Sequence, residues 1–236
     1  MEKITLSPSK LSLMKDCPRC FFDAEALKIK PPRGIFPSLP GGIDRIMKTF
    51  FDGYRGDMPP MLKDKIPGVL YANAEQMRKW RYWRTAPRYY DPILDVEVYG
   101  AIDDLVIENS AHVPADYKTK GQPPKDDGSQ YYMTQMDIYN LLFEHSGRKI
   151  LEKAYIIYVW PKEARAHYFD GHLDASVIDI PFNYKVYVYK CSVKRAKETI
   201  EKAVRIIRGS RPEPSETCER CAYEAARGKI HDIKVV

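Results

Sequence analysis

Hydrophobic residues recur at intervals of three and four in several stretches of the chain, a spacing that places them on one face of an α-helix. The segment from Ser7 to Asp16 has the composition of a short N-capped helix that ends at the first cysteine. Longer helices are predicted over 41–54, 74–84, 129–144 and 193–207. Closely spaced prolines and glycines make 29–40 a loop.

Alternation of hydrophobic and polar residues, which is typical of a half-buried β-strand, begins at Ile93. It predicts one strand over 93–107 and, after a turn, a second over 111–118. The run 154–160 is almost wholly apolar, as in a central strand covered on both faces, and 183–189 predicts a further strand. The order of these elements, without an internal repeat, indicates an α/β fold and one domain over 1–236.

Composition supports a globular protein with a sizeable core. The 236 residues are 44% hydrophobic, and no apolar run approaches the ~20 residues that span a bilayer. The first residues lack the apolar centre of a signal peptide, so we expect a cytoplasmic protein with reduced thiols and no membrane partner. A net charge of +6 suits a polyanionic partner.

The segment 78–84 interleaves basic residues with aromatic ones. Two interpretations fit it equally well. The aromatic rings could stack on unpaired bases of a nucleic acid. Alternatively the segment is an amphipathic helix that buries Met77 and Trp80, with Trp83 as a further candidate, and leaves the arginines in solvent.

Four of the five cysteines form two C-x2-C pairs near opposite ends of the chain. They are Cys17, Cys20, Cys218 and Cys221. Two such pairs supply the four thiolates that zinc or an iron–sulfur cluster requires. The pattern predicts a metal centre within a clasp formed by 1–30 and 209–236. The alternatives are unrelated buried cysteines and disulfides, and disulfides belong to secreted proteins.

Charged residues interrupt the predicted strands at two places. Asp103 follows Gly100-Ala101-Ile102, while Asp116 and Lys118 lie two residues apart and therefore on the same face of the next strand. Pairing of the two strands would bring Asp103 close to both. Two carboxylates form a hard-oxygen site for Mg2+ or Mn2+, and a nearby ammonium can activate water and stabilise charge on a phosphate. The plainer alternative is a turn capped by aspartates beside a solvated lysine.

These residues, followed by Gln135 and Tyr139 on the next predicted helix, resemble the motif series of the PD-(D/E)xK nuclease superfamily. The likeness is strongest to its RecB-like branch, which includes AddB and the CRISPR-associated RecB-like exonucleases. In that branch a Gly-x-Ile-Asp strand, an Asp-x-Lys strand and a Gln-x-x-x-Tyr helix follow one another. The beginning of the chain and the segment around the C-terminal cysteine pair also look like those proteins.

The resemblance implies a restriction-endonuclease-like core, with a central mixed sheet flanked by helices, and a DNA nuclease site that uses Mg2+ or Mn2+. Asp103 and Asp116 would bind the metal ion, and Lys118 would position the attacking water. Gln135 and Tyr139, one helical turn apart, would orient the lysine or hold a DNA phosphate. Tyr139 fits a plain core contact as well. Proteins of this kind serve DNA repair, recombination or CRISPR-type DNA processing.

Two features depart from the RecB-like pattern. Many relatives carry a histidine in the helix after the first cysteine, where this chain has Asp44, a candidate third metal ligand or a helix-start residue that complements the helix dipole. The relatives commonly hold a [4Fe-4S] cluster through one N-terminal and three C-terminal cysteines, whereas this chain has two and two. The resemblance favours [4Fe-4S], while symmetric pairs also look like Zn2+ sites.

Three functions compete at this stage. The leading one is a divalent-metal-dependent DNA nuclease. The second is a catalytically inactive DNA-binding module of the same fold, which the missing histidine favours and the complete set of Asp103, Asp116 and Lys118 opposes. The third is a zinc-stapled protein interaction domain, which would leave those three residues without a purpose.

Overall fold

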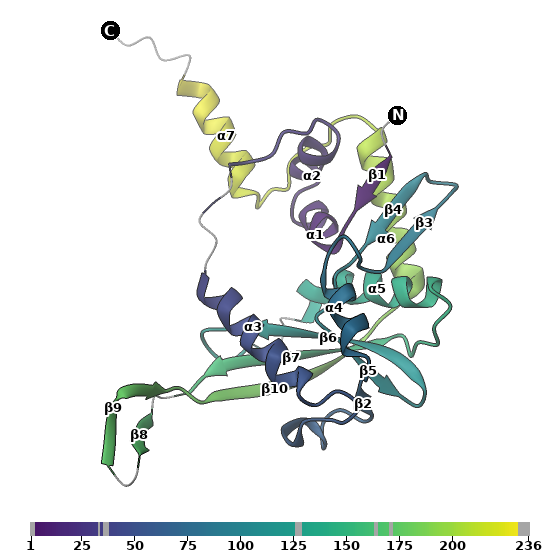
Figure 1. Ribbon diagram of the computed structural model, residues 1–236. Helices are drawn as coiled ribbons and strands as arrows, with labels where there is room; N and C mark the ends of the chain where they lie inside the picture. Colours follow the sequence, from purple (N-terminus) through teal and green to yellow (C-terminus); the bar gives the residue numbers. More distant parts are fainter. Residues whose placement is uncertain are drawn as a thin grey trace.

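The computed structural model describes residues 3–32, 34, 38–125, 129–162, 165–169 and 172–230 (Figure 1). The helices in these residues are α1 (Pro8–Asp16), α2 (Pro18–Glu25), α3 (Ser38–Asp52), α4 (Ala74–Arg81), α5 (Ser129–His145), α6 (Val193–Arg208) and α7 (Glu219–Ile230), with a 3-10 turn at Pro60–Leu62. The strands are β1 (Ile4–Leu6), β2 (Val69–Leu70), β3 (Arg88–Asp91), β4 (Val96–Tyr99), β5 (Asp104–Glu108), β6 (Ala111–Thr119), β7 (Lys153–Pro161), β8 (Arg165–Phe169), β9 (His172–Asp179) and β10 (Phe182–Lys190).

The main sheet has the strand order β10-β7-β6-β5-β2. Strands β6 and β7 run parallel, and every other neighbouring pair is antiparallel. A connection through α5 joins the two parallel strands, as a crossover between parallel strands requires. The sheet is therefore mixed and carries helices on its faces, which confirms the predicted α/β fold class.

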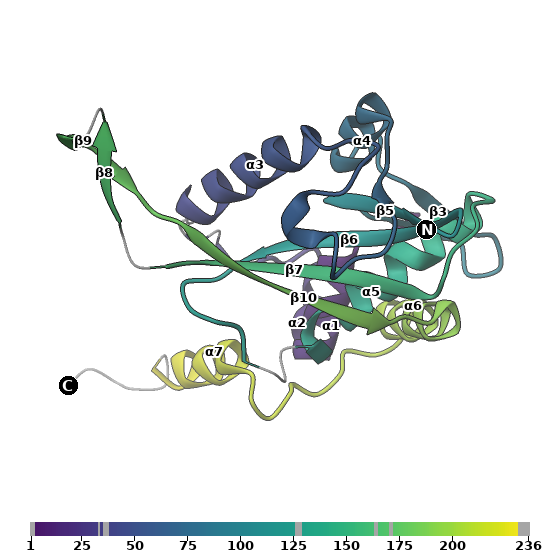
Figure 2. The same cartoon turned by 90° about the horizontal axis from the view of Figure 1, so that it is seen from below.

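Strand β7 is buried on both faces, which explains its nearly continuous apolar sequence. Ile156 and Tyr158 belong to the core under α5 and α6. Tyr155 and Ile157 point to the other side, into a second core that includes Phe51 of α3. Figure 2 shows α3 on one side of the sheet and α5 and α6 on the other.

A smaller sheet lies beside the main one, with the order β1-β4-β3. The N-terminal strand β1 pairs in parallel with β4, so residues 4–6 lie beside residues 96–98 from the middle of the chain. Strands β8 and β9 form an antiparallel pair that projects from the end of β7 and β10 (Figure 1). Along the described chain, no helix combines the length and the apolar character needed to cross a bilayer.

The predicted strand over 93–107 is wrong as one element. The chain leaves the small sheet at Tyr99, bends over 100–103 and enters the main sheet at Asp104. Gly100 makes the bend possible, because a Cβ there would lie 2.8 Å from a ring carbon of Tyr139. Asp103 consequently lies in the bend before β5 and not inside a strand. In the bend its side chain is free to turn towards the edge of the sheet.

Several helix boundaries also differ from the prediction. Helix α3 begins at Ser38, so that the last residues of the predicted loop 29–40 are helical. Helices α2 and α7 were not predicted, and each of them begins directly after the first cysteine of a C-x2-C pair. The second cysteine of each pair therefore lies in the first turn of a helix.

Candidate functional site

Asp116 and Lys118 lie on β6 and face α5. Their neighbour Tyr117 points to the opposite side of the sheet, where its ring stacks on Phe51 of α3 at a centroid distance of 4.6 Å. Asp116 is 1% exposed, and its Oδ2 lies 2.5 Å from Lys118 Nζ. The alternation of the strand thus places a carboxylate and an ammonium on the same face, as the spacing predicts. The carboxylate is almost fully buried, whereas the Lys118 side chain is 20% exposed.

Asp103 reaches the same place from the bend before β5. Its Oδ2 accepts a hydrogen bond of 3.1 Å from the backbone N–H of Tyr117, between the two charged residues of β6. The guanidinium of Arg81 stabilises the bend, because its Nε donates to the backbone oxygen of Asp103 at 2.7 Å. The antiparallel pairing of β5 with β6 therefore brings Asp103 beside Asp116, as the sequence predicts.

Gln135 of α5 connects both charged residues of β6. Its Nε2 donates to Asp116 Oδ1 at 2.9 Å, and its Oε1 accepts from Lys118 Nζ at 3.3 Å. Tyr139, one turn further, lies with its hydroxyl oxygen 2.7 Å from Gln135 Nε2 and donates to the backbone oxygen of Ala101 at 2.7 Å. One helix face therefore holds Asp116, Lys118 and the bend that carries Asp103 in a fixed arrangement.

Burial and the charge of Asp103 raise the pKa of Asp116 to about 7. Burial lowers the pKa of Lys118, but the Asp116 and Asp103 carboxylates raise it by more, so the ammonium form is favoured. Two acidic groups that interact in this way present oxygen ligands to a hard cation. Asp116 Oδ2 is a further indication of a metal site. This oxygen is buried and has no hydrogen-bond partner of suitable geometry among the described residues, although Lys118 Nζ is near. The donor set therefore fits a divalent cation.

Asp44, the predicted third ligand, lies on α3 with Lys48 one turn after it. Lys48 Nζ stands 2.7 Å from Asp44 Oδ2 and 2.8 Å from Asp103 Oδ1. The structure therefore brings Asp44 to the site, with an ammonium between the two carboxylates. Sequence reasoning missed Lys48, although the four-residue interval from Asp44 was a readable signal for a contact on one helix face.

A buried ionic network lies beneath the site, and sequence reasoning missed it as well. Asp104, which is fully buried, accepts two hydrogen bonds of 2.6 Å from Arg55. It also accepts from Arg81 at 3.3 Å and from the Tyr117 hydroxyl. Asp52 at the end of α3 binds both arginines. The network joins α3, α4, β5 and β6, the elements that carry the site.

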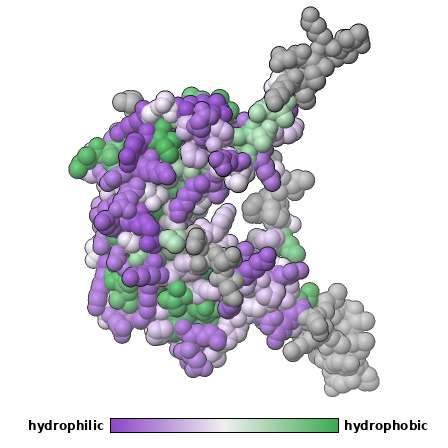
Figure 3. All heavy atoms as spheres, turned by 180° about the vertical axis from the view of Figure 1, so that it is seen from behind, coloured by the Kyte–Doolittle hydropathy of each residue, from purple (hydrophilic) through white to green (hydrophobic). Residues whose placement is uncertain are grey.

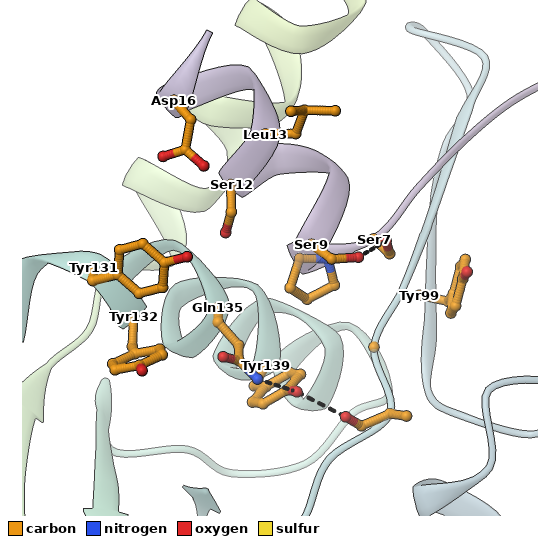
Figure 4. A pocket seen from close by; sticks show the side chains of 13 residues that line it. Ser7, Ser9, Ser12, Leu13, Asp16, Tyr99, Tyr131, Tyr132, Gln135 and Tyr139 are labelled. Carbon is orange, nitrogen blue, oxygen red and sulfur yellow. Dashed lines mark hydrogen bonds between the residues drawn. The ribbon is translucent and has the colours of Figure 1, made fainter. Parts of the chain in front are cut away.

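A pocket of about 480 Å3 opens next to Gln135 and Tyr139 (Figure 4). Figure 4 shows Ser9 and Ser12 of α1 above the pocket and Tyr131, Tyr132 and Gln135 of α5 below it. Ser7, Pro8 and Tyr99 also line it. The side chain of Ser7, the N-cap residue, makes no capping hydrogen bond to α1. Such a helix start favours an anion.

The segment of basic and aromatic residues at the end of α4 and just after it divides between core and surface. Met77 and Trp80 are buried, as the helical interpretation predicts, whereas Tyr82 and Trp83 are 45% and 51% exposed. That interpretation is wrong for Arg81, whose side chain is only 13% exposed because it binds Asp52 and Asp104. The Arg84 guanidinium lies over the Trp83 ring at 5.0 Å, and Trp83 neighbours Tyr99 of the pocket at 6.3 Å. Figure 3 shows that the face of the molecule opposite to that in Figure 1 is mainly hydrophilic, with hydrophobic residues in separate small groups.

The four paired cysteines come together as predicted, and their sulfur atoms all lie within 4.8 Å of one another. Cys17 lies 3.8 Å from Cys221, and Cys20 lies 3.6 Å from both Cys218 and Cys221. Cys191 is buried elsewhere, as a thiol on the core near α6.

The pKa values of the paired cysteines are shifted in opposite directions. Burial and the neighbouring thiols raise the pKa of Cys20. Burial also raises the pKa of Cys17, but backbone N–H groups of Cys20 and Ser215 lower it by more, to about 7. A thiolate is therefore already favoured at Cys17, and thiolate is the form that binds metal.

Contacts around the cysteines hold the two ends of the chain together. Arg211 binds Asp23 of α2 through two contacts of 2.7 Å. Arg19 of α2 donates to the backbone oxygen of Pro212 at 2.9 Å and binds Glu213. The segment between α6 and α7 is thus attached to α2 even apart from the sulfur atoms.

Comparison with known proteins gives one family. Residues 44–226 match the model of the PD-(D/E)XK nuclease superfamily. No curated protein matches the chain. Among solved structures, "Crystal structure of SSO0001" is similar, with a TM-score of 0.47 and 14% identity over 95% of this chain and 86% of that chain.

Proposed function

The chain belongs to the PD-(D/E)XK nuclease superfamily, and on this basis we propose that it is a deoxyribonuclease that hydrolyses phosphodiester bonds with Mg2+ or Mn2+. The observation that carries the proposal is the joint placement of Asp103, Asp116 and Lys118 at one buried corner. A complete set of this kind argues against the catalytically inactive module, because burying these charges is costly without a purpose.

Each residue of the site has a role in this proposal. Asp103 and Asp116 would hold the divalent cation, which supplies Lewis-acid stabilisation of charge on the phosphate and lowers the pKa of a water. Lys118 would position the attacking water and stabilise negative charge. Gln135 would fix Asp116 relative to Lys118, and Tyr139 would fix Gln135 relative to the bend. Asp44 stays a predicted third ligand, which requires that Lys48 leave the place between the carboxylates.

The surroundings of the site support DNA as the substrate. The serine hydroxyls and the start of α1 suit a phosphate, while Tyr131 and Tyr132 offer rings to bases. The exposed Trp83 and Arg84 extend this surface beyond Tyr99. We further propose that the protein lies in the RecB-like branch and serves DNA repair, recombination or CRISPR-type processing, because the motif series and the terminal cysteines occur together.

Metal-dependent cleavage tests the proposal. Purified protein incubated with linear single- and double-stranded DNA is expected to cut when Mn2+ or Mg2+ is present and to stop when EDTA is added. Lys118→Met should slow single-turnover cleavage by about 10²-fold, because one preorganised cation is lost. Lys194→Met, which changes an exposed lysine on α6, is the matched control and should cut at the wild-type rate.

Binding of DNA without cleavage under any divalent metal would overturn the nuclease and favour the inactive module. Cleavage that is unchanged in Lys118→Met would leave a nuclease but remove Lys118 from its site.

For the cysteine centre, we propose a single Zn2+ ion. Zinc–sulfur bonds of about 2.3 Å in a tetrahedron place neighbouring sulfur atoms about 3.8 Å apart. Three of the four contacts between the pairs measure 3.6 to 3.8 Å, and all four sulfurs lie within 4.8 Å of one another, which supports that arrangement. In a [4Fe-4S] cluster each thiolate binds a different iron atom, so the sulfurs must stand farther apart. The spacing therefore favours zinc over the cluster that the resemblance implies.

Loss of this centre is expected to loosen the clasp, which we place in the described parts of 1–30 and 209–236. Protein purified without added metal should be colourless and contain one zinc per chain. Cys218→Ser should lose the zinc and lower the melting temperature by about 5 °C, and trypsin should then cut near α7. Cys191→Ser is the matched control, because it changes a buried thiol outside the centre. Brown protein with absorption near 400 nm would instead establish the iron–sulfur cluster.

A further inference from the structure

Lys48 is the one residue of the site for which the proposed mechanism has no role. Its ammonium stands between two carboxylates, 2.7 Å from Asp44 Oδ2 and 2.8 Å from Asp103 Oδ1. Its side chain is 23% exposed, so Lys48 is mostly but not completely shielded from solvent. Asp103 Oδ2 already accepts the Tyr117 N–H. Lys48 therefore occupies the carboxylate oxygen that a metal ion would use.

The position of Lys48 is fixed by the packing of α3. Phe51, three residues later, stacks on Tyr117 of β6, and Asp52 binds Arg55 and Arg81. These contacts hold the C-terminal half of α3 against the strand that carries Asp116 and Lys118. Two lysines thus flank the carboxylate pair, with Lys118 at Asp116 and Lys48 at Asp103.

A divalent cation cannot share this oxygen with an ammonium at contact distance without strong repulsion. When the cation binds Asp103, the Lys48 ammonium must move away, and α3 limits how far it can go. The phosphate to be cleaved would then be the nearest anion without a partner. During hydrolysis the water oxygen bonds to phosphorus, the bond between phosphorus and the leaving oxygen breaks, and a proton of the water passes to the leaving oxygen, while negative charge grows on the remaining phosphate oxygens. A second cation at that point stabilises the transition state.

We propose that Lys48 is a second catalytic lysine, which neutralises Asp103 and Asp44 in the metal-free protein and binds the scissile phosphate once the divalent cation has entered. The inference rests on the proposed nuclease function. It also gives Asp44 a specific role as the anchor of Lys48, in place of the third metal ligand considered above.

Two measurements on the full chain test the role of Lys48. Mn2+ affinity is measured without DNA, from the electron paramagnetic resonance signal of free Mn2+, and cleavage is measured in single turnover. Lys48→Met should bind Mn2+ at least about tenfold more tightly, because a competing cation is gone. The same variant should cleave about 10²-fold more slowly. Lys48→Arg should recover part of the rate. Lys194→Met, another helical lysine with an acidic residue four positions away, should change neither quantity.

The two readouts separate the competing explanations, once circular dichroism has shown that the variants are folded. An Mn2+ affinity in Lys48→Met that is unchanged or weaker would overturn the competition between Lys48 and the metal. Tighter Mn2+ binding with an unchanged cleavage rate would overturn the contact with phosphate. Weaker Mn2+ binding in Asp44→Asn would make Asp44 a ligand and overturn its role as the anchor. A wild type that binds Mn2+ but cuts no DNA would refute the nuclease, while the Mn2+ affinities would still decide whether Lys48 competes.

Discussion

Asp116→Asn is expected to abolish cleavage and, at the same time, to stabilise the metal-free protein. Asparagine keeps the shape of the side chain but replaces a charged metal ligand with a neutral amide, so we expect a loss of more than about 10³-fold in single-turnover rate. Stability should change in the opposite direction, because burial and Asp103 raise the pKa of this carboxyl to about 7 in the folded chain. A residue with a purely structural role would not show these opposite effects.

The pH dependence of stability follows from the same raised pKa. The unfolded chain ionises Asp116 near pH 3.8, while the folded chain holds its proton up to about pH 7. The folded state therefore binds more protons between these values, and the metal-free protein loses stability as the pH rises through them. At pH 8 Asp116→Asn should be more stable than wild type by roughly 4 kcal/mol, whereas at pH 4 the difference should be small.

Urea unfolding in EDTA at pH 4 and pH 8 measures this effect. The comparison is made between wild type and Asp116→Asn, and the control is Asp95→Asn, which changes an exposed aspartate outside the site. A stability difference between wild type and Asp116→Asn that is the same at both pH values would contradict the raised pKa, even if cleavage is lost.

Arg55→Met is expected to cause the largest loss of stability, about 3–5 kcal/mol, because it leaves the buried Asp104 carboxylate without its main partner. Asp104 is fully buried and receives two contacts of 2.6 Å from Arg55. Arg81 remains, but its contact with Asp104 is longer, at 3.3 Å. Because Arg81 also binds the backbone of Asp103, we expect cleavage to fall together with stability.

A second variant separates the cost of the unpaired charge from the loss of packing. Arg55→Met combined with Asp104→Leu removes both charges, and it should recover more than half of the lost free energy of unfolding. Lys63→Met is the surface control, because it breaks the exposed ion pair with Asp57 and should leave the denaturation midpoint unchanged. A double variant no more stable than the single one would show that packing around Arg55, and not charge, sets the stability of this region.

The residues of the candidate site were predictable to the extent that their spacing is local. Asp116 and Lys118 share a strand face because side chains alternate, and Gln135 and Tyr139 share a helix face because of the four-residue interval. Asp103 was predicted correctly as a neighbour but in the wrong setting. The alternating pattern over 93–107 carries no sign that β4 and β5 belong to different sheets. In the bend, Gly100 packs so closely against Tyr139 that a side chain at this position would clash.

The partners of Asp104 and Asp103 could not be predicted from the sequence, for a different reason. Arg55, Arg81 and Lys48 lie 22 to 55 residues from these aspartates along the chain, and their charges look like those of any solvated surface residue. Nothing in a single sequence distinguishes an arginine that will be 6% exposed from one that will be in solvent. The packing of α3 and α4 on the sheet edge decides which of them become buried.

The fold class could be predicted from the sequence, together with the strand that carries Asp116 and Lys118, the helix that carries Gln135 and Tyr139, and the two pairs of terminal cysteines. Each of these depends on a short repeat, a period of two or about 3.6 residues or a two-residue gap between cysteines, which the backbone geometry imposes locally. The packing of the elements was needed to place Lys48 between Asp44 and Asp103, to bury Asp104 between two arginines, and to bring the four sulfurs within 4.8 Å of one another. These distances depend on how elements that are far apart in the sequence pack together. Burial then affects the protonation state of the groups that meet and the strength of the interactions between them.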